Sequence, residues 1–387
     1  MKTTFAYLLA PIAFASALSA QETRSSQARE LATKVRAAIT AEELDRVTHG
    51  IVDHERPSGS VGENAAIDHI VYELGREGVP VQVHSFQAYA SDPVSARLEV
   101  VGSDFSHAAI TMSFSGSASG LEAALVDVGA LRDLPSLEVG TGERLTLRGN
   151  EHPRNLPNGI DVRGAIALVE GQPRNAPTAV LAELGAAGII FSNPEERLND
   201  LIVTSTWGTP SLRNQHRIPT IPTAQIKKSA GDELRALLAQ GPVRVRLNVE
   251  VSTGWKEQRI AVARIPAPDS TAPYVLFGGH IDGWYHGATD EAASNAAMLE
   301  LAIAFYHNRD LLRRGLVVAW WPGHSNGRYA GSTWFADHFF EELRERGLAY
   351  VNIDGIGQME AKRFGATTTS SMAGLASRVV RERTSAE

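Results

Sequence analysis

A chain of 387 residues is long enough to form roughly two or three domains with a buried core, and its net charge of −7 argues against nucleic-acid binding. Charged residues make up 21% of the sequence and apolar residues 43%, which is typical of a folded globular protein. The absence of cysteine excludes disulfides and thiolate metal sites, so any metal must be held by His, Asp or Glu.

The first twenty residues differ from the rest of the chain. Lys2 is followed by the apolar run FAYLLAPIAFASAL, which is short for a bilayer span, and then by small residues and polar QETRSS. This order predicts a signal peptide over residues 1–20, and therefore a secreted or periplasmic protein; a buried N-terminal helix is the alternative. No other segment is apolar enough to span a membrane.

Residues 21–118 are expected to form helices followed by strands. The run ELATKVRAAITAEELDRVTHGIV has helical spacing of its apolar residues. A second helix opens near Glu63, repeats apolar residues at Ala66, Ile70 and Leu74, and stops at Gly78. The alternation in VPVQVHSF and the run ARLEVVG indicate strands.

Residues 119–250 predict a compact α/β module inserted between two parts of a larger domain. The segments DVRGAIALVEG, AVLAELGAAGIIFSN and RIPTIPTAQIKKSAGDELRALLAQG alternate short apolar strands with helices, and VRVRLNVEV ends the module as a strand. Between them lies a long polar loop with Trp207 that could overhang a site; none of its residues is assigned a function.

Residues 251–387 predict a doubly wound, mostly parallel sheet of the α/β class. Three apolar strands, PYVLFGGHIDG, GLVVAWW and LAYVNIDG, alternate with two helices, EAASNAAMLELAIAFYHN and WFADHFFEELRERG. Ligands of such sheets bind beyond the carboxyl ends of the strands. Six polar residues lie at or after those ends: His280, Asp282, Asp290, His324, Ser325 and Asp354.

The spacing of four of these residues favours a metal site over a set of unrelated polar residues at strand ends. His280 and Asp282 are two residues apart, so on an extended chain they point the same way, and the carboxylate could hold the imidazole N–H. Asp290 opens the next helix and Asp354 ends the neighbouring strand. One imidazole and two carboxylates suit a zinc ion that keeps a position open for water or substrate.

These motifs resemble a known family. FGGHIDGWYHGATDEAASNAAMLELA followed by YVNIDG resembles the zinc aminopeptidases and glutamate carboxypeptidases of the aminopeptidase Y type, and the module over residues 119–250 looks like their protease-associated domain. The run AEELDRVTHGIVDHERPSGSVGENAAIDHIVYELGREGVPVQVHSF is similar to the family's opening helices and first strand. The resemblance implies a zinc-exopeptidase sheet made of residues 21–118 and 251–387, with the second part truncated at its C-terminus.

Carried over residue by residue, the resemblance implies that His280 and Asp354 bind one zinc, that Asp290 bridges two zincs and that Asp282 supports His280. The family's Glu-Glu pair, a general base followed by a ligand of the other zinc, is replaced here by His324-Ser325. The family's final His ligand is also missing, because no His follows Asp354. Both differences affect the same metal, so we expect one zinc, or two if the sequence is a fragment.

Two roles remain open for the loop GHSNG. His324 could be a general base or a substitute metal ligand, or it could be a loop histidine bonded to backbone. The G-x-S-x-G pattern allows Ser325 to be a hydrolase nucleophile, but only His338 follows it, and that residue lies in the very next helix. The interpretation favoured by the metal ligands is that Ser325 replaces a metal-binding glutamate.

The resemblance therefore implies a secreted, exopeptidase-like, metal-dependent peptidase that acts on a peptide or a small amide. The alternative is a non-catalytic protein of the same fold that binds peptides or a partner, or an inactive fragment. A truncated sheet would leave an apolar surface exposed, which predicts association or instability. The sequence leaves the substrate, the metal identity and the oligomeric state open.

Overall fold

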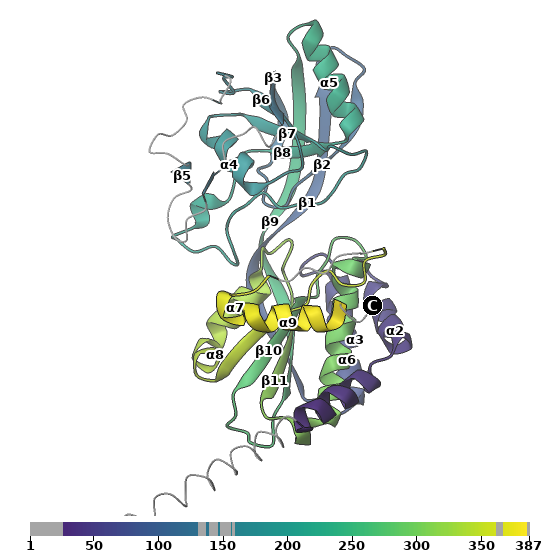
Figure 1. Cartoon of the computed structure of the whole chain (residues 1–387). Helices are drawn as coiled ribbons and strands as arrows, with labels where there is room; N and C mark the ends of the chain where they lie inside the picture. Colours follow the sequence, from purple (N-terminus) through teal and green to yellow (C-terminus); the bar gives the residue numbers. More distant parts are fainter. Residues whose placement is uncertain are drawn as a thin grey trace, which may run out of the picture.

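A computed structural model describes residues 26–130, 137–138, 146–147, 156, 159–360 and 367–384 (Figure 1). The predicted signal peptide, residues 1–20, lies outside the described residues. Among the helices that are described, none has both the length and the apolar character needed to cross a membrane. The chain begins its described part with a helix over residues 26–38.

One mixed sheet of ten strands runs through the molecule in the order β1-β2-β8-β7-β6-β3-β9-β11-β10-β12. Its three last strands, β10, β11 and β12, are the parallel strands predicted from the C-terminal part of the sequence, and the predicted α/β class with an inserted module is confirmed. The strands are β1 (Val81–Val100), β2 (Ser106–Thr111), β3 (Ala118–Ala130), β6 (Ile166–Glu170), β7 (Gly188–Ser192), β8 (Thr223–Ile226), β9 (Arg244–Ile265), β10 (Tyr274–His280), β11 (Gly315–Trp321) and β12 (Gly347–Asn352). Two short strands, β4 (Leu137–Glu138) and β5 (Thr146–Leu147), pair separately.

The two longest strands join the inserted module to the rest of the chain. β1 and β9 pair antiparallel from Val81 opposite Ala263 to Val100 opposite Val245, so they form a continuous ribbon. Figure 1 shows this ribbon running from the lower lobe, with β10 and β11, into the upper lobe, with α5 (Lys228–Gln240). The domain boundary predicted at residue 250 lies within β9. This one strand serves both lobes, so its sequence gives no local sign of where one lobe ends and the other begins.

In the upper lobe, two helices flank the strands of the module. They are α4 (Asn175–Glu183) and α5 (Lys228–Gln240). The strands β6, β7 and β8 are parallel and almost fully buried, which explains the apolar runs of β6 and β7, whereas β8 buries the polar side chains of Thr223 and Gln225 between its apolar ones.

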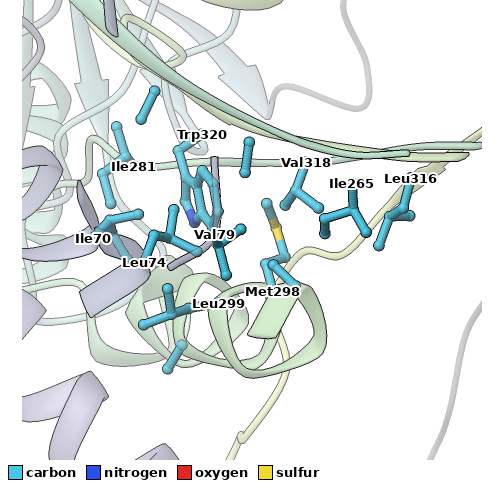
Figure 2. Close-up of a cluster of buried hydrophobic side chains, with 14 of the residues drawn as sticks. Ile70, Leu74, Val79, Ile265, Ile281, Met298, Leu299, Leu316, Val318 and Trp320 are labelled. Carbon is cyan, nitrogen blue, oxygen red and sulfur yellow. The ribbon is translucent and has the colours of Figure 1, made fainter. Parts of the chain in front are cut away.

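In the lower lobe, helices cover both faces of the sheet. Alternate residues of β11 point to opposite faces, so that Trp320 and Trp321 enter two different cores. Trp320 is fully buried on one face of the sheet, beside Leu74, Met298 and Leu299 (Figure 2). Trp321 faces the other core, together with Phe335. The helices are α2 (Ala41–Val52), α3 (Val61–Arg76) and α6 (Ala293–His307) on the first face, and α7 (Ala330–His338) and α8 (Phe340–Arg346) on the second.

The predicted helix near Glu63 begins slightly earlier than expected. Its N-cap is Ser60, whose hydroxyl accepts the amide of Glu63, and Ala66, Ile70 and Leu74 are buried as predicted. Glu63 is the third residue of the helix, and its carboxylate accepts the amide of Gly59. The arrangement is close to a capping box, but the amide of Ser60 donates to the oxygen of Pro57, so Glu63 binds the residue before the N-cap while it faces inward.

The strand β12 forms an edge of the sheet with apolar side chains on its surface. Leu348 is 59% exposed and Tyr350 is 52% exposed, and Met359 beyond the strand is 91% exposed. The last described helix, α9 (Ala373–Thr384), also exposes Leu375. An edge strand with exposed apolar side chains favours pairing with another chain.

We therefore expect the purified 387-residue chain to self-associate through β12. Leu348→Lys should weaken this association at least tenfold, since placing a lysine in an apolar contact costs more than about 1.4 kcal/mol. Light scattering after size exclusion measures the effect. Leu212→Lys is the control, because Leu212 is an exposed leucine on the inserted module. Equal association of both variants would show that β12 is not the contact.

Candidate metal centre

The candidate site lies where three parallel strands end. β10 ends at His280, which is opposite Trp321 at the end of β11, and Asn352 at the end of β12 is opposite Gly278 of β10. The segments that follow the three strands therefore start at the same edge of the sheet, as expected for this class of fold.

His280 is the centre of this cluster. It is only 3% exposed, and its Nδ1 lies 2.6 Å from the backbone oxygen of Asp282, which leaves Nε2 free to face carboxylates. Nε2 lies 3.1 Å from Oδ1 of Asp290 and 3.8 Å from Oε2 of Glu291. Burial by itself lowers the pKa of His280, but the contact with Asp290 and the neighbouring carboxylates outweigh it and raise the pKa to about 10.

Glu291 is a candidate ligand that the sequence prediction missed. One ligand atom from each of His280, Glu291 and Asp354 can be chosen so that all three lie within 4.8 Å of one another. Glu291 is fully buried, and burial raises the pKa of its carboxyl to about 10. Its Oε1 accepts the amide of His280, and its Oε2 has no hydrogen-bond partner in the described part of the chain. A buried carboxylate oxygen without a partner is the kind of group that a cation satisfies.

The local backbone explains why two consecutive acidic residues both reach His280. Sequence reasoning placed Asp290 at the start of a regular helix, which would turn the next side chain away. Instead, Asp290 and Glu291 have non-helical φ values of −122° and −140°, and the regular helix α6 begins only at Ala293. Asp290 stays at the rim, with its side chain 59% exposed, whereas Glu291 enters the core.

This donor set fits a zinc ion. Zinc in proteins takes imidazole nitrogen and carboxylate oxygen, and His280, Glu291 and Asp354 offer one such atom each within the 4.8 Å limit. A dication at this point would favour the ionised form of Glu291 and the neutral form of His280, opposite to the metal-free preference. Asp290 contacts the same Nε2 from the exposed side, but it does not belong to the group whose ligand atoms lie within 4.8 Å of one another, so its role as a bridging ligand stays a prediction.

Asp282 has a different contact from the one predicted. Its Oδ1 lies 3.9 Å from Nδ1 of His280, so the imidazole pairs with the backbone oxygen of Asp282 and not with its carboxylate. The carboxylate instead accepts the amides of His324 at 2.9 Å and Ser325 at 2.8 Å, and the hydroxyl of Ser58 at 2.7 Å. Asp282 therefore positions the loop after β11 beside His280.

Two further buried charges support these loops. Arg56 has no exposed surface, and its guanidinium donates to the backbone oxygens of Ile281, His286 and Gly287. Glu63 accepts the amide of Gly323, and burial together with Asp282 raises the pKa of Glu63 well above its usual range. Arg56 lies in the turn-rich segment before α3 and Glu63 lies in the first turn of α3, and the sequence analysis assigned neither residue a role at the site.

His324 lies beside the cluster but outside the group of three ligand atoms. Its ring stacks on that of His280, with centroids 3.9 Å apart, and meets Tyr329 edge-on at 4.6 Å. Burial and the neighbouring His280 lower the pKa of His324 to about 4. The imidazole is therefore neutral at physiological pH and able to accept a proton.

The surroundings of Ser325 do not favour a nucleophile. Ser325 is 4% exposed, and its amide is bound to Asp282. His338, the histidine that would have to act as its base, stacks on Trp334 at 4.5 Å and contacts Phe339 in the opposite core of the lobe. A serine nucleophile needs its base within hydrogen-bond reach, and His338 is packed elsewhere.

Comparisons with known proteins match two parts of the chain. Residues 261–386 match Peptidase family M28, and residues 128–234 match the PA domain. The probable glutamate carboxypeptidase VP8 of Zea mays is 23% identical over 240 residues, which cover 51% of this chain and 34% of that protein. Aminopeptidase NAALADL1 of Mus musculus is 36% identical over 85 residues, or 21% of this chain and 11% of that protein. The matches thus span about a third or less of these curated relatives.

Two solved structures share the fold. An aminopeptidase from Aneurinibacillus sp. strain AM-1 superposes with a TM-score of 0.62 at 21% identity, covering 85% of this chain and 73% of that one. A zinc aminopeptidase from Bacillus subtilis gives a TM-score of 0.57 at 19% identity, covering 82% and 68%. At these identities the likeness establishes the arrangement of the elements.

Proposed function

We propose that this chain is an active metal-dependent exopeptidase that hydrolyses peptide or related amide bonds. The match of residues 261–386 to Peptidase family M28, the family predicted from the sequence, supports this proposal. The observation that carries the proposal is the convergence of His280, Glu291 and Asp354 at one edge of the sheet. A zinc ion at this point would polarise the scissile carbonyl and lower the pKa of a water.

The residues around the metal centre have separable roles in this proposal. His280, Glu291 and Asp354 hold the ion, and Asp290 closes the exposed side. His324 is the candidate proton acceptor because it is neutral and stacked on His280.

We propose a single resident zinc ion. Ser325 occupies the position at which the family has a ligand of a second zinc, and its amide is bound to Asp282 with the side chain buried. A serine hydroxyl is a poor replacement for a carboxylate ligand of zinc.

A non-catalytic peptide-binding protein is the second candidate. The replacement of the family's Glu-Glu pair by His324-Ser325 favours it, because no carboxylate takes the place of the general base at these two positions. The ligand cluster disfavours it, since a buried carboxylate oxygen without a partner is costly to keep unless a cation uses it.

The double variant His324→Glu/Ser325→Glu distinguishes the two candidates. If the chain is an active peptidase adapted to His324, zinc-dependent hydrolysis of aminoacyl and peptidyl substrates will be measurable in the unchanged chain. It will then fall about 10-fold or more in the variant, because the imidazole is lost and two carboxylates are added beside Asp282, Asp290 and Asp354. Activity that is absent in the unchanged chain and emerges in the double variant would instead assign it to the non-catalytic class. Phe340→Ser, at an exposed position on α8, is a control for handling and folding.

We also propose that the protein is exported, on the strength of the signal-like residues 1–20. The intact mass of the protein recovered from the producing cell tests this. Export with processing predicts an N-terminus between Ala17 and Gln21, whereas a retained Met1 in the cytoplasm would contradict the proposal.

A further inference from the structure

A cleft between the two lobes lies apart from the metal centre. Its volume is about 810 Å³, a size that is usual for small-ligand sites, and none of the described residues that line it belongs to the ligand cluster. Three segments form its walls: the loop of the inserted module that contains Trp207, the ribbon of β1 and β9, and the helix α7. The proposed peptidase activity gives this cleft no role.

Three of the six tryptophans of the chain line this cleft. They are Trp207, Trp255 and Trp334, one from the module loop, one from β9 and one from α7. Trp334 is stacked on Phe86 at 4.6 Å and on His338 at 4.5 Å, so its position is fixed by its neighbours. In contrast, Trp207 is 63% exposed and Trp255 is 62% exposed. Two large aromatic side chains that are this exposed in one cleft indicate a ligand that covers them.

Contacts between the lobes hold the tryptophan of the module loop in place. The amide of Gly208 donates to the backbone oxygen of Arg328 at 2.6 Å. The amide of Tyr89 donates to the hydroxyl of Thr209 at 3.3 Å. Gly208 has a φ of 67° and lies so close to Thr333 of α7 that a side chain at this position would clash. The walls of the cleft are therefore held together by the chain itself, and a ligand enters a preformed site.

Polar groups with unused hydrogen-bonding capacity lie among the aromatic rings. The exposed carboxylate of Asp337 has no hydrogen-bond or ion-pair partner in the described part of the chain. The side-chain oxygen of Asn214 accepts the amide and the hydroxyl of Ser211, which leaves the NH2 group of Asn214 for a ligand. Gln87 adds an exposed amide, and the tryptophans add indole N–H donors. A ligand of this cleft therefore meets several donors together with an acceptor-only carboxylate.

The charges at the cleft disfavour ions and purely apolar molecules as its ligand. The guanidinium carbon of Arg328 lies 5.7 Å from the ring centroid of Trp207, so a cation stacked on this ring would meet a like charge. The carboxylate of Asp337 repels an anion. An apolar ligand would remove water from Asp337 and Asn214 without replacing its hydrogen bonds.

A neutral ligand rich in hydroxyl groups meets all of these conditions. A hydroxyl group donates to a carboxylate and also accepts from an amide or indole N–H, which a backbone amide cannot do with a single group. The C–H faces of a pyranose ring are apolar enough to stack on an indole, while the hydroxyl groups at its edge point outward.

We propose that this cleft binds a neutral oligosaccharide of pyranose sugars. The sugar rings stack on Trp207 and Trp255, and their hydroxyl groups donate to Asp337 and accept from Asn214. The site goes beyond the proposed peptidase function and is independent of it, because no residue of the ligand cluster lines the cleft.

Titration calorimetry of the full chain with cellohexaose, maltohexaose and chitohexaose tests the proposal. We expect at least one of these neutral hexasaccharides to bind with a Kd of about 1 mM or tighter and to change the fluorescence of the exposed tryptophans. The affinity should be the same with and without zinc. Anionic hexagalacturonate and the cation benzyltrimethylammonium should bind about tenfold more weakly or worse, because each meets a like charge.

Two exposed tryptophans allow variants that leave the core intact. Trp207→Ala and Trp255→Ala should each weaken binding about tenfold, the effect of losing one stacking partner. Asp337→Asn should weaken it several-fold, because a charged acceptor becomes a neutral one. Tyr72→Ala is the matched control, since Tyr72 is an aromatic residue of α3 that is 65% exposed and does not line the cleft.

Weaker binding in at least one of the two tryptophan variants, with an unchanged melting temperature and unchanged binding by Tyr72→Ala, supports the proposal. Absence of binding to all three neutral hexasaccharides overturns it, as does an unchanged affinity in both tryptophan variants. Binding that requires zinc would place the sugar at the metal centre and overturn it as well. A neutral peptide such as N-acetyl-(Ala-Ser)3-amide that binds more tightly than every sugar, and loses affinity in the tryptophan variants, would assign the cleft to peptides instead.

Discussion

Replacing His280 by alanine is expected to abolish zinc binding. The imidazole is the only nitrogen donor in the cluster with Glu291 and Asp354, and without it two carboxylates face each other in a buried site. Changes around metal ligands commonly weaken affinity 10–100-fold, so removal of a ligand should cost at least about 100-fold. In the unchanged chain, zinc at a hundred times its Kd should raise the free energy of unfolding by about 2.7 kcal/mol, and the same zinc concentration should give about 0.4 kcal/mol or less in His280→Ala.

Thermal unfolding with and without zinc, together with the zinc content after dialysis, measures the effect. His307→Ala is the matched control, because His307 is a half-exposed histidine at the end of α6, remote from the ligand cluster. Glu291→Gln tests the ligand that the sequence prediction missed, and it should also reduce zinc affinity strongly. A His280→Ala protein that binds zinc as tightly as the unchanged chain would refute the proposed site.

Replacing Asp282 by alanine is expected to destabilise the lower lobe by about 3–5 kcal/mol, the usual cost of removing one member of a buried charged network. The carboxylate is fully buried and accepts three hydrogen bonds, from Ser58, His324 and Ser325. Without it, the two backbone amides and the hydroxyl of Ser58 lose their acceptor, although the hydroxyl still accepts the amide of Asn326. The positive charge of Arg56 also loses a nearby compensating charge.

Urea denaturation at constant pH measures this cost. Asp282→Asn keeps the size of the side chain and one acceptor oxygen, so it should cost less than the alanine variant. Ser58→Ala removes only one of the three donors and should cost about 1 kcal/mol. A loss of less than about 1 kcal/mol in Asp282→Ala would mean that the loop after β11 is held by other contacts.

The observed site differs from the predicted one at Asp282 and Glu291. The rule that residues two apart on a strand face the same way holds only while the chain remains a strand. β10 ends at His280, so Asp282 no longer follows the alternation, and its carboxylate turns to the loop after β11. In the same way, the expectation that Asp290 opens a regular helix missed Glu291, because the helix begins at Ala293.

The sequence by itself determined the class of fold, the resemblance to Peptidase family M28 and the edge of the sheet at which His280, Asp290 and Asp354 would lie. These follow from local patterns, since apolar runs and helical spacing reflect burial along a single element, and parallel strands place their carboxyl ends together. Only the tertiary structure decided the contacts that no local pattern records. Ser58 reaches Asp282 across 224 positions of the chain, and Trp207 of the module reaches Arg328. Such pairs depend on the conformation of loops between strands, where periodicity carries no information and the packing of the two lobes fixes which side chains meet.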